Sequence, residues 1–272
     1  MTSPTPAPVR SYETIVLTRK ERLLTITLNR PESLNAVNLQ MHEELADVFS
    51  FAASDTHSDV ILLTGAGRAF SAGGDLDHIA NNAAHPQLFD REVRVAKRIV
   101  FAMLDLDKPV VCRMNGHAIG LGATLALLSD VIFAAETAKI GDPHVALGLV
   151  AGDGGAVIWA QRIGLGRAKE YLLTGELLTA RKAEDIGLIN HCVPASELDA
   201  AVDAFCNRLL AGASQAIRCT KILTNLELKR VATAVMDAGI AYEAVSVRTA
   251  DHREGVKALR EKRKPVFGRN EP

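Results

Sequence analysis

Two glycine-rich segments hold the residue types that could stabilise negative charge on a bound molecule. The first reads FSAGGD at positions 70–75, and the second reads NGHAIGLG at positions 115–122. Glycine lets a backbone approach a ligand closely, and free N–H groups at the start of a helix point toward negative charge. If both segments face one point, their amides form a two-donor oxyanion hole, which stabilises charge that develops on a carbonyl oxygen.

Two other interpretations of these segments stay open from the residues alone. Both segments could be tight turns that serve only packing, or they could bind a phosphate group. The chain lacks the phosphate-binding pattern G-x-x-x-x-G-K-[ST], and the first segment lacks G-x-G-x-x-G. The residues therefore favour an oxyanion hole, but only slightly over packing.

The elements around these segments alternate between strands and helices. Alternating apolar and polar residues predict strands at 12–18 and 23–28, and Asn38 is placed to cap a helix that ends near residue 53. The apolar run at 60–64 predicts a strand buried on both faces, directly before the first glycine-rich segment. Further along we predict a helix at 88–106, a strand at 109–113, a helix at 123–128 and a strand at 131–135. This order is typical of an α/β fold.

From about residue 195 the pattern changes to helices alone, predicted at 198–210, 215–226, 232–247 and 254–262. We therefore expect a disordered tail over residues 1–10, a core over residues 11–195 and a helical region over residues 196–272. The helical region has many apolar positions and few loops to cover them, which suggests that it packs on another subunit.

Composition excludes several classes of protein. Hydrophobic residues make up 48% of the 272, which suffices for one large core with a small helical appendage. The formal net charge is −1, whereas a nucleic-acid-binding domain usually carries a strongly basic face. Aromatic residues are only 4%, which disfavours stacking on bases. The first residues lack the apolar segment of a signal peptide, and the longest apolar run is interrupted by polar residues and glycine, so we expect a cytoplasmic protein without a membrane span.

The four cysteines, Cys112, Cys192, Cys206 and Cys219, form no C-x-x-C pair and have no histidine at metal-ligand spacing. They are best interpreted as buried free thiols in a reducing cytosol. We therefore expect neither a metal site nor a redox cofactor.

Several short motifs, in order along nearly the whole chain, resemble the enoyl-CoA hydratase/isomerase (crotonase) superfamily. They are LNRP at 28–31 with LNA at 34–36, AFSAGGD at 69–75, KP at 108–109, NGHAIG at 115–120, Gly148, Gly155 and EKRKP at 261–265. Each is weak alone, but together at the family's spacing they are specific. The resemblance implies a crotonase-like spiral of ββα turns with a helical C-terminal trimerisation region. It also implies trimers that commonly pair into hexamers, and an acyl-CoA substrate in which CoA arrives as part of the substrate.

The resemblance also assigns residues to the site. By position, the oxyanion donors would be the backbone N–H groups of Ala72 and Leu121, although the family commonly has glycine at the second place. A bulkier residue there could narrow the acyl pocket. Lys264 and Phe267 lie in the stretch that reaches a neighbouring subunit's CoA, where a basic residue suits the 3′-phosphate; otherwise Lys264 is simply solvated. The remaining substrate contacts would be Ala36, Ser71, Gly73, Gly74, Asp75 and Gly120.

The chain departs from the family at both catalytic glutamates, which are replaced by Thr124 and His144. Addition of water to a double bond needs a base and an acid, and a lone hydroxyl is neither near neutral pH, whereas histidine can be either. One carboxylate, Asp153, follows His144 by nine positions. A His–Asp pair could position the imidazole as a general base or protonate an enolate.

Structural interpretations compete with these roles. His144 could be a hydrogen-bonded histidine beside a proline turn, and Asp153 could cap a helix at 154–163. The resemblance favours a catalytic His144 and leaves the two interpretations of Asp153 even. His78 and His85 have no partner in the sequence, and we expect both to be exposed.

One branch of the superfamily hydrolyses a carbon–carbon bond of cyclic β-diketones in a retro-Claisen reaction, and it resembles this chain at His144 and Asp153. It also carries an acidic residue on a C-terminal helix, which Glu243 could match, although a solvated or interface carboxylate is the simpler interpretation. Our first hypothesis is an acyl-CoA enzyme of the hydratase/isomerase type, a lyase or isomerase with a His144–Asp153 pair. The alternatives are the β-diketone hydrolase and a catalytically inactive protein that binds acyl-CoA.

Overall fold

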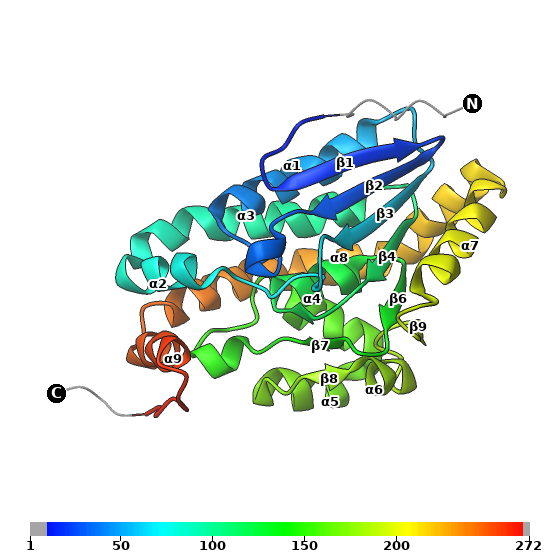
Figure 1. Ribbon diagram of the computed structural model, residues 1–272. Coiled ribbons are helices and arrows are strands. Elements are labelled where there is room, and N and C mark those ends of the chain that lie inside the picture. The colour runs from blue at the N-terminus through cyan, green and yellow to red at the C-terminus, as the bar shows by residue number, and fades with distance from the viewer. Residues whose placement is uncertain (1–9, 269–272) are drawn as a thin grey trace.

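The computed structural model describes residues 10–268 of the chain, apart from the side chains of Arg91 and Val93 (Figure 1). Residues 1–9 of the predicted tail lie outside this range. Within it, no helix combines the length and the apolar character needed to cross a membrane.

The main sheet has six strands in the order β1-β2-β3-β4-β6-β9. Strands β1 (Ile15–Lys20) and β2 (Leu23–Leu28) are antiparallel, and every later strand joins in parallel: β3 (Val60–Gly65), β4 (Val110–Met114), β6 (Val131–Ala135) and β9 (His191–Val193). The predicted β2 is confirmed, whereas β1 begins three residues later than predicted and ends two residues later. Its end lies at Lys20 because the turn takes up only two residues, with a positive φ at Glu21. The parallel strands read as continuous apolar runs because both their faces are buried.

A second, smaller sheet was not predicted. It contains β5 (Ala118–Ile119), β7 (Lys139–Gly141) and β8 (Leu178–Thr179), in that order. Strands of two or three residues are too short for a hydrophobic period to show. This sheet holds the second glycine-rich segment, since β5 lies within it.

Helices cover the main sheet and carry the rest of the core. They are α1 (Leu39–Ser54), α2 (Leu76–Ala84), α3 (Pro86–Asp105), α4 (Leu121–Leu128), α5 (Gly155–Thr174) and α6 (Ala180–Asp185), with single 3₁₀ turns η1 (Pro31–Ser33) and η2 (His144–Leu147). Asn38 caps α1 as predicted, through its side chain and the amide of Met41 at 2.9 Å. Every residue of α4 is buried, as expected of a helix that is apolar on all sides. Helix α2 was missed, although Asp75 caps it.

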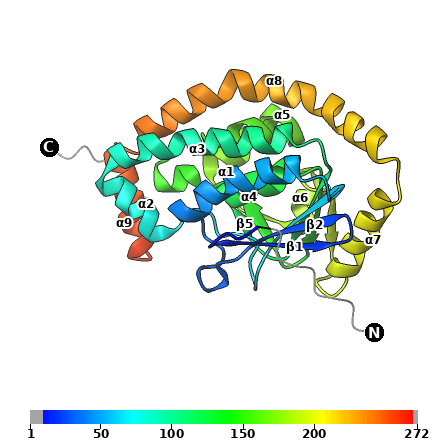
Figure 2. The ribbon, with the colours of Figure 1, turned by 90° about the horizontal axis from the view of Figure 1, so that it is seen from above.

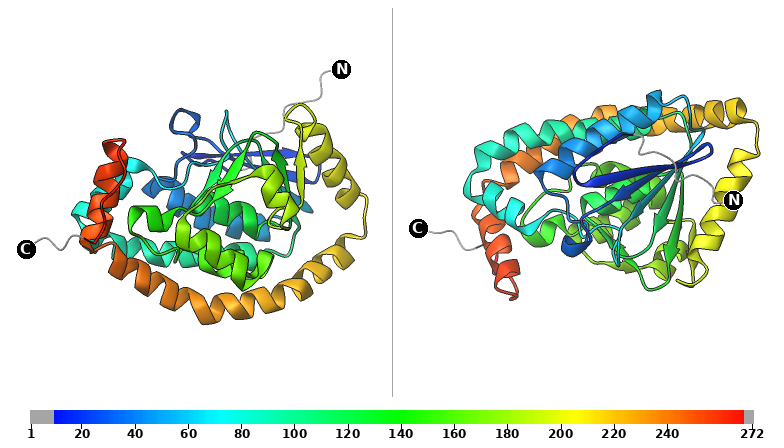
Figure 3. Two further views of the ribbon diagram at one scale, coloured as in Figure 1. Left: turned by 90° about the horizontal axis from the view of Figure 1, so that it is seen from below. Right: turned by 45° about the horizontal axis from the view of Figure 1, so that its top comes forward.

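The C-terminal part of the described chain is helical, as predicted, and contains no strand after Val193. It consists of α7 (Leu198–Leu210), α8 (Ser214–Ser246) and α9 (Ala250–Arg260). We predicted two helices, at 215–226 and 232–247, but this stretch forms the single helix α8. The helix continues because no glycine or proline interrupts the chain between Gly212 and Gly239. Figures 2 and 3 show α8 as a long arc that passes over α3 and α5 and joins α7 at one end to α9 at the other.

Candidate active site

The two glycine-rich segments are joined directly to each other, as the oxyanion-hole hypothesis required. The amide of Ser71 donates to the carbonyl of His117 at 3.0 Å, and the amide of Ile119 donates back to Ser71 at 3.0 Å. A side chain on Gly122 would collide with Ser71, and one on Gly73 would meet the carbonyl oxygen of Ile119 at 2.9 Å. Small residues are therefore required because the two backbones pack against each other.

The first predicted oxyanion donor is wrong. The amide of Ala72 is already occupied, because it donates to the carbonyl oxygen of Leu34 at 3.0 Å. An N–H group that is committed to a backbone acceptor cannot also stabilise a substrate oxygen without losing that bond.

Two other amides on these segments have no acceptor within residues 10–268. Gly74 pairs with Val37 in a parallel bridge, which uses the amides of Val37 and Asp75 and leaves that of Gly74 free. Leu121 is the first residue of α4, whose first amides have no partner within the helix. The amide of Leu121, the second predicted donor, is thus available, and the amide of Gly74 is available where that of Ala72 is not.

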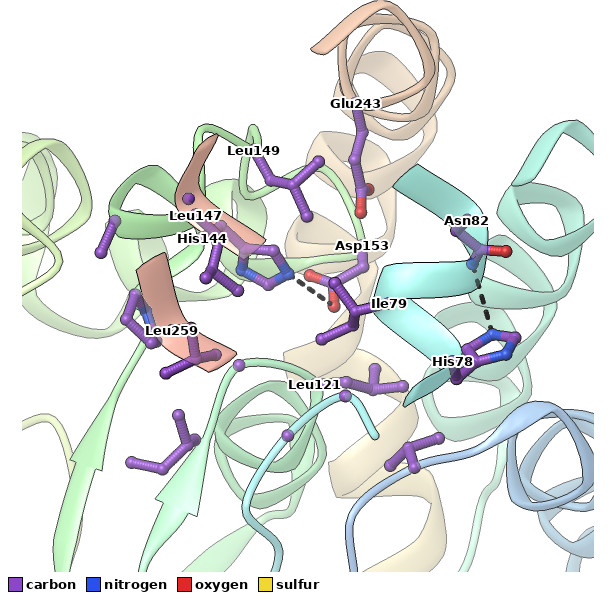
Figure 4. Close-up of a pocket in the computed structure, with 18 of the residues that line it drawn as sticks. His78, Ile79, Asn82, Leu121, His144, Leu147, Leu149, Asp153, Glu243 and Leu259 are labelled. Carbon is purple, nitrogen blue, oxygen red and sulfur yellow. Dashed lines mark hydrogen bonds and ion pairs between the residues drawn. The ribbon is translucent and has the colours of Figure 1, made fainter. Parts of the chain in front are cut away.

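A cavity of about 490 Å³ opens beside these amides (Figure 4). Most of its wall is apolar and comes from α2, α3, α9 and η2. Seven residues predicted at the site lie on the wall: Ala72, Gly73, Gly74, Gly120, Leu121, His144 and Asp153.

Six other predicted site residues do not line the cavity. The hydroxyl of Ser71 donates to the carbonyl of Asn35 at 2.8 Å, and Asp75 pairs with Arg30 at 3.0 Å while it caps α2. Arg30 also donates to the carbonyl of Ala36 at 2.6 Å. These three residues therefore hold the loop in shape instead of touching a substrate.

Thr124 is the fourth. It is fully buried in α4 beneath the cavity, and its methyl group packs so closely on Gly154 that a Cβ there would collide with it. A catalytic role in direct contact with substrate is thus wrong for Thr124. Lys264 and Phe267 are exposed beyond α9 and do not line this chain's cavity, and their contact with a neighbouring subunit's CoA stays a prediction.

His144 is held between two carboxylates. Its Nδ1 is hydrogen-bonded to Asp142, whose side chain is completely buried, and its Nε2 lies 3.6 Å from Oδ2 of Asp153. Asp142 was not predicted, and its position two residues before His144 was the available signal. A side chain on Gly155 would overlap the carboxylate of Asp142, so glycine is required there. The capping role of Asp153 is wrong, since Gly154 precedes α5 and no side chain caps it.

Glu243 joins this group from α8. It is only 5% exposed, lines the cavity and points toward Asp153 (Figure 4). The interpretation of Glu243 as a solvated or interface carboxylate is therefore wrong. Three of the four acid/base side chains come from the turns after β7, and the fourth comes from a helix about 90 residues later.

Burial and charge set the protonation of this group. Burial lowers the pKa of His144, but the carboxylates of Asp142 and Asp153 outweigh it and hold that pKa well above its ordinary value. Burial raises the pKa of Asp153, although His144 opposes this. Burial, and then the charge of Asp153, raise the pKa of Glu243 well above its ordinary value. These shifts favour a charged imidazolium on His144 and extend to higher pH the range over which Glu243 stays protonated.

Asp142, His144 and Asp153 also have the atom types and spacing of metal ligands, with ligand atoms within 4.8 Å of one another. The hydrogen bond from Nδ1 of His144 to Asp142 makes the group better suited to proton transfer than to metal binding. The shared protons and the neighbouring amides fit a site that polarises a carbonyl and moves protons beside it.

A second polar group lies on another part of the same wall. His78 is half-buried and its Nε2 lies 2.7 Å from Glu92, so our expectation that it is exposed is wrong. The cause is α2, which was not predicted and turns His78 toward α3. His85, at the end of α2, is exposed as predicted.

Comparisons with known proteins identify the family. The sequence model of the enoyl-CoA hydratase/isomerase family matches residues 18–270 of this chain. The crotonyl-CoA hydratase of Syntrophomonas wolfei is 32% identical over 259 residues, which cover 94% of this chain and 98% of that protein. The crystal structure of an enoyl-CoA hydratase/isomerase from Mycobacterium paratuberculosis is 39% identical, with a TM-score of 0.88 over 92% of this chain and 100% of that one.

A β-diketone hydrolase from Anabaena, bound to (S)-3-oxocyclohexyl acetic acid, is 28% identical with a TM-score of 0.81, covering 87% of this chain and 95% of that one. The crotonase-like α/β fold with a helical C-terminal region is thereby confirmed. This chain belongs to the enoyl-CoA hydratase/isomerase family.

Proposed function

We propose that this enzyme acts on an acyl-CoA thioester through an enolate held by the amides of Gly74 and Leu121. The observation that carries the proposal is the convergence of two unoccupied amides with His144, Asp153 and Glu243 on one cavity. Paired amides stabilise an enolate oxygen more than a neutral carbonyl, which lowers the barrier to forming the enolate. The curated relative that adds water to crotonyl-CoA supports a hydratase-type reaction.

The proton donors and acceptors of the site are sufficient for the addition of water to an enoyl thioester. The carboxylate of Asp153, which faces Nε2 of the charged His144, takes a proton from water while the water oxygen bonds to the β-carbon and the enolate forms. A protonated Glu243 then gives its proton to the α-carbon, and Asp153 returns the proton of water to Glu243. One water is consumed, the double bond is lost, and the enzyme regains its starting state. These steps need no metal or redox cofactor, and CoA would arrive as part of the substrate.

Turnover of crotonyl-CoA by the wild type and by His144→Ala tests the proposal. We expect measurable hydration by the wild type and a loss of about 10²- to 10⁴-fold in kcat, the usual contribution of a general acid or base. His85→Ala, which removes an exposed histidine, should leave turnover unchanged. Full hydratase activity in His144→Ala would overturn the role of His144.

A second candidate function is hydrolysis of a carbon–carbon bond in a cyclic β-diketone. Two observations favour it: the similarity to a β-diketone hydrolase, and the charge of the wall. Among the side chains that the structure describes, which do not include those of Arg91 and Val93, Arg263 is the lone Lys or Arg on the cavity wall. It is engaged by Glu254 at 2.9 Å and Glu261 at 2.6 Å. This chain's own cavity therefore offers no free cation for CoA phosphates in its described part.

The diketone reaction would use the same groups. Water activated by the His144–Asp153 pair would attack one carbonyl, the bond to the central carbon would break, and the enolate leaving group would be held by the two amides until protonated. The products are a carboxylic acid and a ketone within one opened ring. Cyclohexane-1,3-dione should therefore be assayed beside crotonyl-CoA. Turnover of the diketone alone would replace the first proposal with the second.

A further inference from the structure

The proposed reaction gives no role to His252, a fully buried histidine near the start of α9. Its ring reaches η2, which lies far earlier in the chain, and there Nδ1 is 2.8 Å from the carbonyl oxygen of Leu147. A carbonyl oxygen can only accept a hydrogen bond, so Nδ1 of His252 carries the proton of the ring. His252 therefore links α9 to the turn that begins with His144.

This hydrogen bond satisfies a carbonyl group that η2 cannot satisfy itself. The carbonyl of His144 accepts the amide of Leu149 at 2.9 Å, and that of Val145 accepts the amide of Gly148 at 3.0 Å. Leu147 is the last residue of the turn, where a carbonyl has no partner within its own helix. The ring of His252 supplies the missing donor.

Two glycines bring the backbones of α9 and η2 into direct contact around this bond. A Cβ on Gly148 would lie 2.7 Å from the amide nitrogen of His252. A Cβ on Gly255 would lie 2.7 Å from the carbonyl carbon of Leu147. Neither position has room for a side chain, so a movement of one element changes the contacts of the other.

Helix α9 also forms part of the cavity wall, through Gly255 and Leu259. Figure 4 shows Leu259 and Leu147 on the same side of the cavity as His144. The same helix thus encloses a substrate and holds the turn that presents His144 to it.

The ring of His252 is suited to a hydrogen bond with a neutral carbonyl. Burial lowers the pKa of His252 more than its bond to Leu147 raises it, and the charge of His144 lowers this pKa further. A neutral ring at this place adds no second positive charge near His144. Nε2 of His252 is buried without a partner among the described residues, so the bond through Nδ1 is the polar contact that this ring makes there.

The carboxylates that face His144 are held by α5 instead of α9. Asp142 packs so closely on Gly155, the first residue of α5, that a Cβ there would overlap its carboxylate. Asp153 lies two positions before the same helix. If η2 came loose from α9, His144 could therefore shift relative to both carboxylates.

We propose that His252 is a positioning residue of the reaction, which keeps His144 in place by fixing η2 to the helix that closes the cavity. This inference rests on the proposed function, since it adds to the same site a residue that acts on substrate only through His144. A shift of about 1 Å in a reacting group can cost about a hundredfold in rate, so a single hydrogen bond at this distance from the substrate can matter for turnover.

The test compares two variants that differ in whether a donor remains. His252→Leu removes the donor, whereas the side-chain amide of His252→Asn places a donor as many bonds from Cα as Nδ1 is. Because Asp142 and Asp153 raise the pKa of His144, we expect its NMR titration to move to lower pH in His252→Leu and to stay near that of the wild type in His252→Asn.

Turnover is measured on whichever of crotonyl-CoA and cyclohexane-1,3-dione the wild type converts. In His252→Leu, kcat should fall by about ten- to a hundredfold while KM changes by less than about threefold. His252→Asn should keep kcat within about threefold of the wild type. His85→Leu is the matched control, since it makes the same substitution at an exposed histidine, and it should change neither the titration of His144 nor kcat.

An unshifted His144 in His252→Leu, or equal losses of kcat in both variants, would overturn the inference. If neither variant folds, the nitrogen-15 shifts of the wild-type ring decide the question, because the inference requires the proton on Nδ1 of His252 and a proton on Nε2 would sink it. A wild type that converts neither substrate would refute the proposed function, and the titration of His144 would still decide the role of His252.

Discussion

His144 is fixed by Asp142 on one ring nitrogen and faces Asp153 with the other. The bond at Nδ1 sets both the orientation of the ring and the place of its proton. Asp142 is therefore a positioning residue, because it acts on substrate only through His144.

Replacing Asp142 by asparagine tests this arrangement. The carboxylates of Asp142 and Asp153 together raise the pKa of His144, so removing the charge of Asp142 should shift the titration of His144 to lower pH. NMR titration of the ring proton would measure that shift. We also expect kcat to fall by about a hundredfold, within the range for loss of acid–base function.

Asp237→Asn is the matched control for that substitution, because Asp237 is an exposed carboxylate on α8 that pairs with Lys97. It should leave both the His144 titration and kcat unchanged. An Asp142→Asn variant with an unshifted histidine would show that Asp153 alone sets the protonation of His144.

The roles of single residues were predicted well where they depend on the residue's own place in the sequence. They were predicted poorly where they depend on a contact with a residue distant in the sequence. The glycine-rich segments and His144 could be found from the sequence. Ala72 was assigned as a donor because the choice between Ala72 and Gly74 depends on which amides pair with residues 34–37. Asp142 and Glu243 were missed or misjudged because their partners are brought to them only by the fold.

At the scale of elements, α8 has two functions along one uninterrupted helix. It packs on α3 and α5, and it carries Glu243 into the cavity. A carboxyl group buried in this way destabilises the fold once the unfolded chain can ionise it.

The sign of this effect follows from the raised pKa of Glu243. In the unfolded chain Glu243 ionises near its ordinary pKa of 4.5, whereas the folded protein keeps the proton to higher pH. Above about pH 4.5 Glu243 is ionised in the unfolded chain but still protonated in the folded protein, which favours the unfolded state. The free energy of unfolding therefore falls as the pH rises toward the folded pKa. Glu243→Gln should therefore be more stable than the wild type near pH 7, by about 1–3 kcal/mol, and the difference should vanish as the pH falls to about 4.5.

Urea denaturation across this pH range measures the difference, and the same preparation should show reduced turnover because Gln cannot donate the proton. Asp237→Asn, at an exposed position of α8, should show little pH-dependent change. A Glu243→Gln variant that is less stable than the wild type at neutral pH would contradict the assignment of a buried, protonated carboxyl.

Strands and helices were predicted correctly where they are long enough to show a hydrophobic period in the sequence. Strands β2 and β6 and helices α1 and α7 agree with the sequence closely. Helix α2 was missed because it is only nine residues long and contains few large apolar residues, so its hydrophobic period covers too short a stretch of sequence. The small sheet was missed because its strands are set by backbone pairing with neighbours instead of by a pattern of their own.

At the scale of the whole molecule, α8 leaves large apolar side chains uncovered in two places along its length. They are Ile222, Leu223 and Leu226 in one place and Tyr242 and Val245 in the other, each between 47% and 67% exposed. Clustered exposed apolar side chains often mark an interface, and we propose a homotrimer, or a hexamer made of two trimers.

Light scattering on the purified protein should therefore give three or six times the mass of the 29.2 kDa chain. Leu223→Asp with Leu226→Asp should lower that mass, because burying two charges in an interface is costly. Leu165→Asp, at an exposed leucine of α5, should not change the mass unless α5 also contributes to the interface. A monomeric wild type would contradict the proposal.

The cavity is finished by elements that follow the main sheet along the chain. The amides of Gly74 and Leu121 and the side chain of His144 lie within the first 144 residues, whereas Glu243, Gly255 and Leu259 close the wall from α8 and α9. Since domains fold from the N-terminus during synthesis, a growing chain can form its sheet before it can enclose a substrate. A chain cut before α9 would thus lack part of the cavity wall, and catalysis should begin only once α9 has been made.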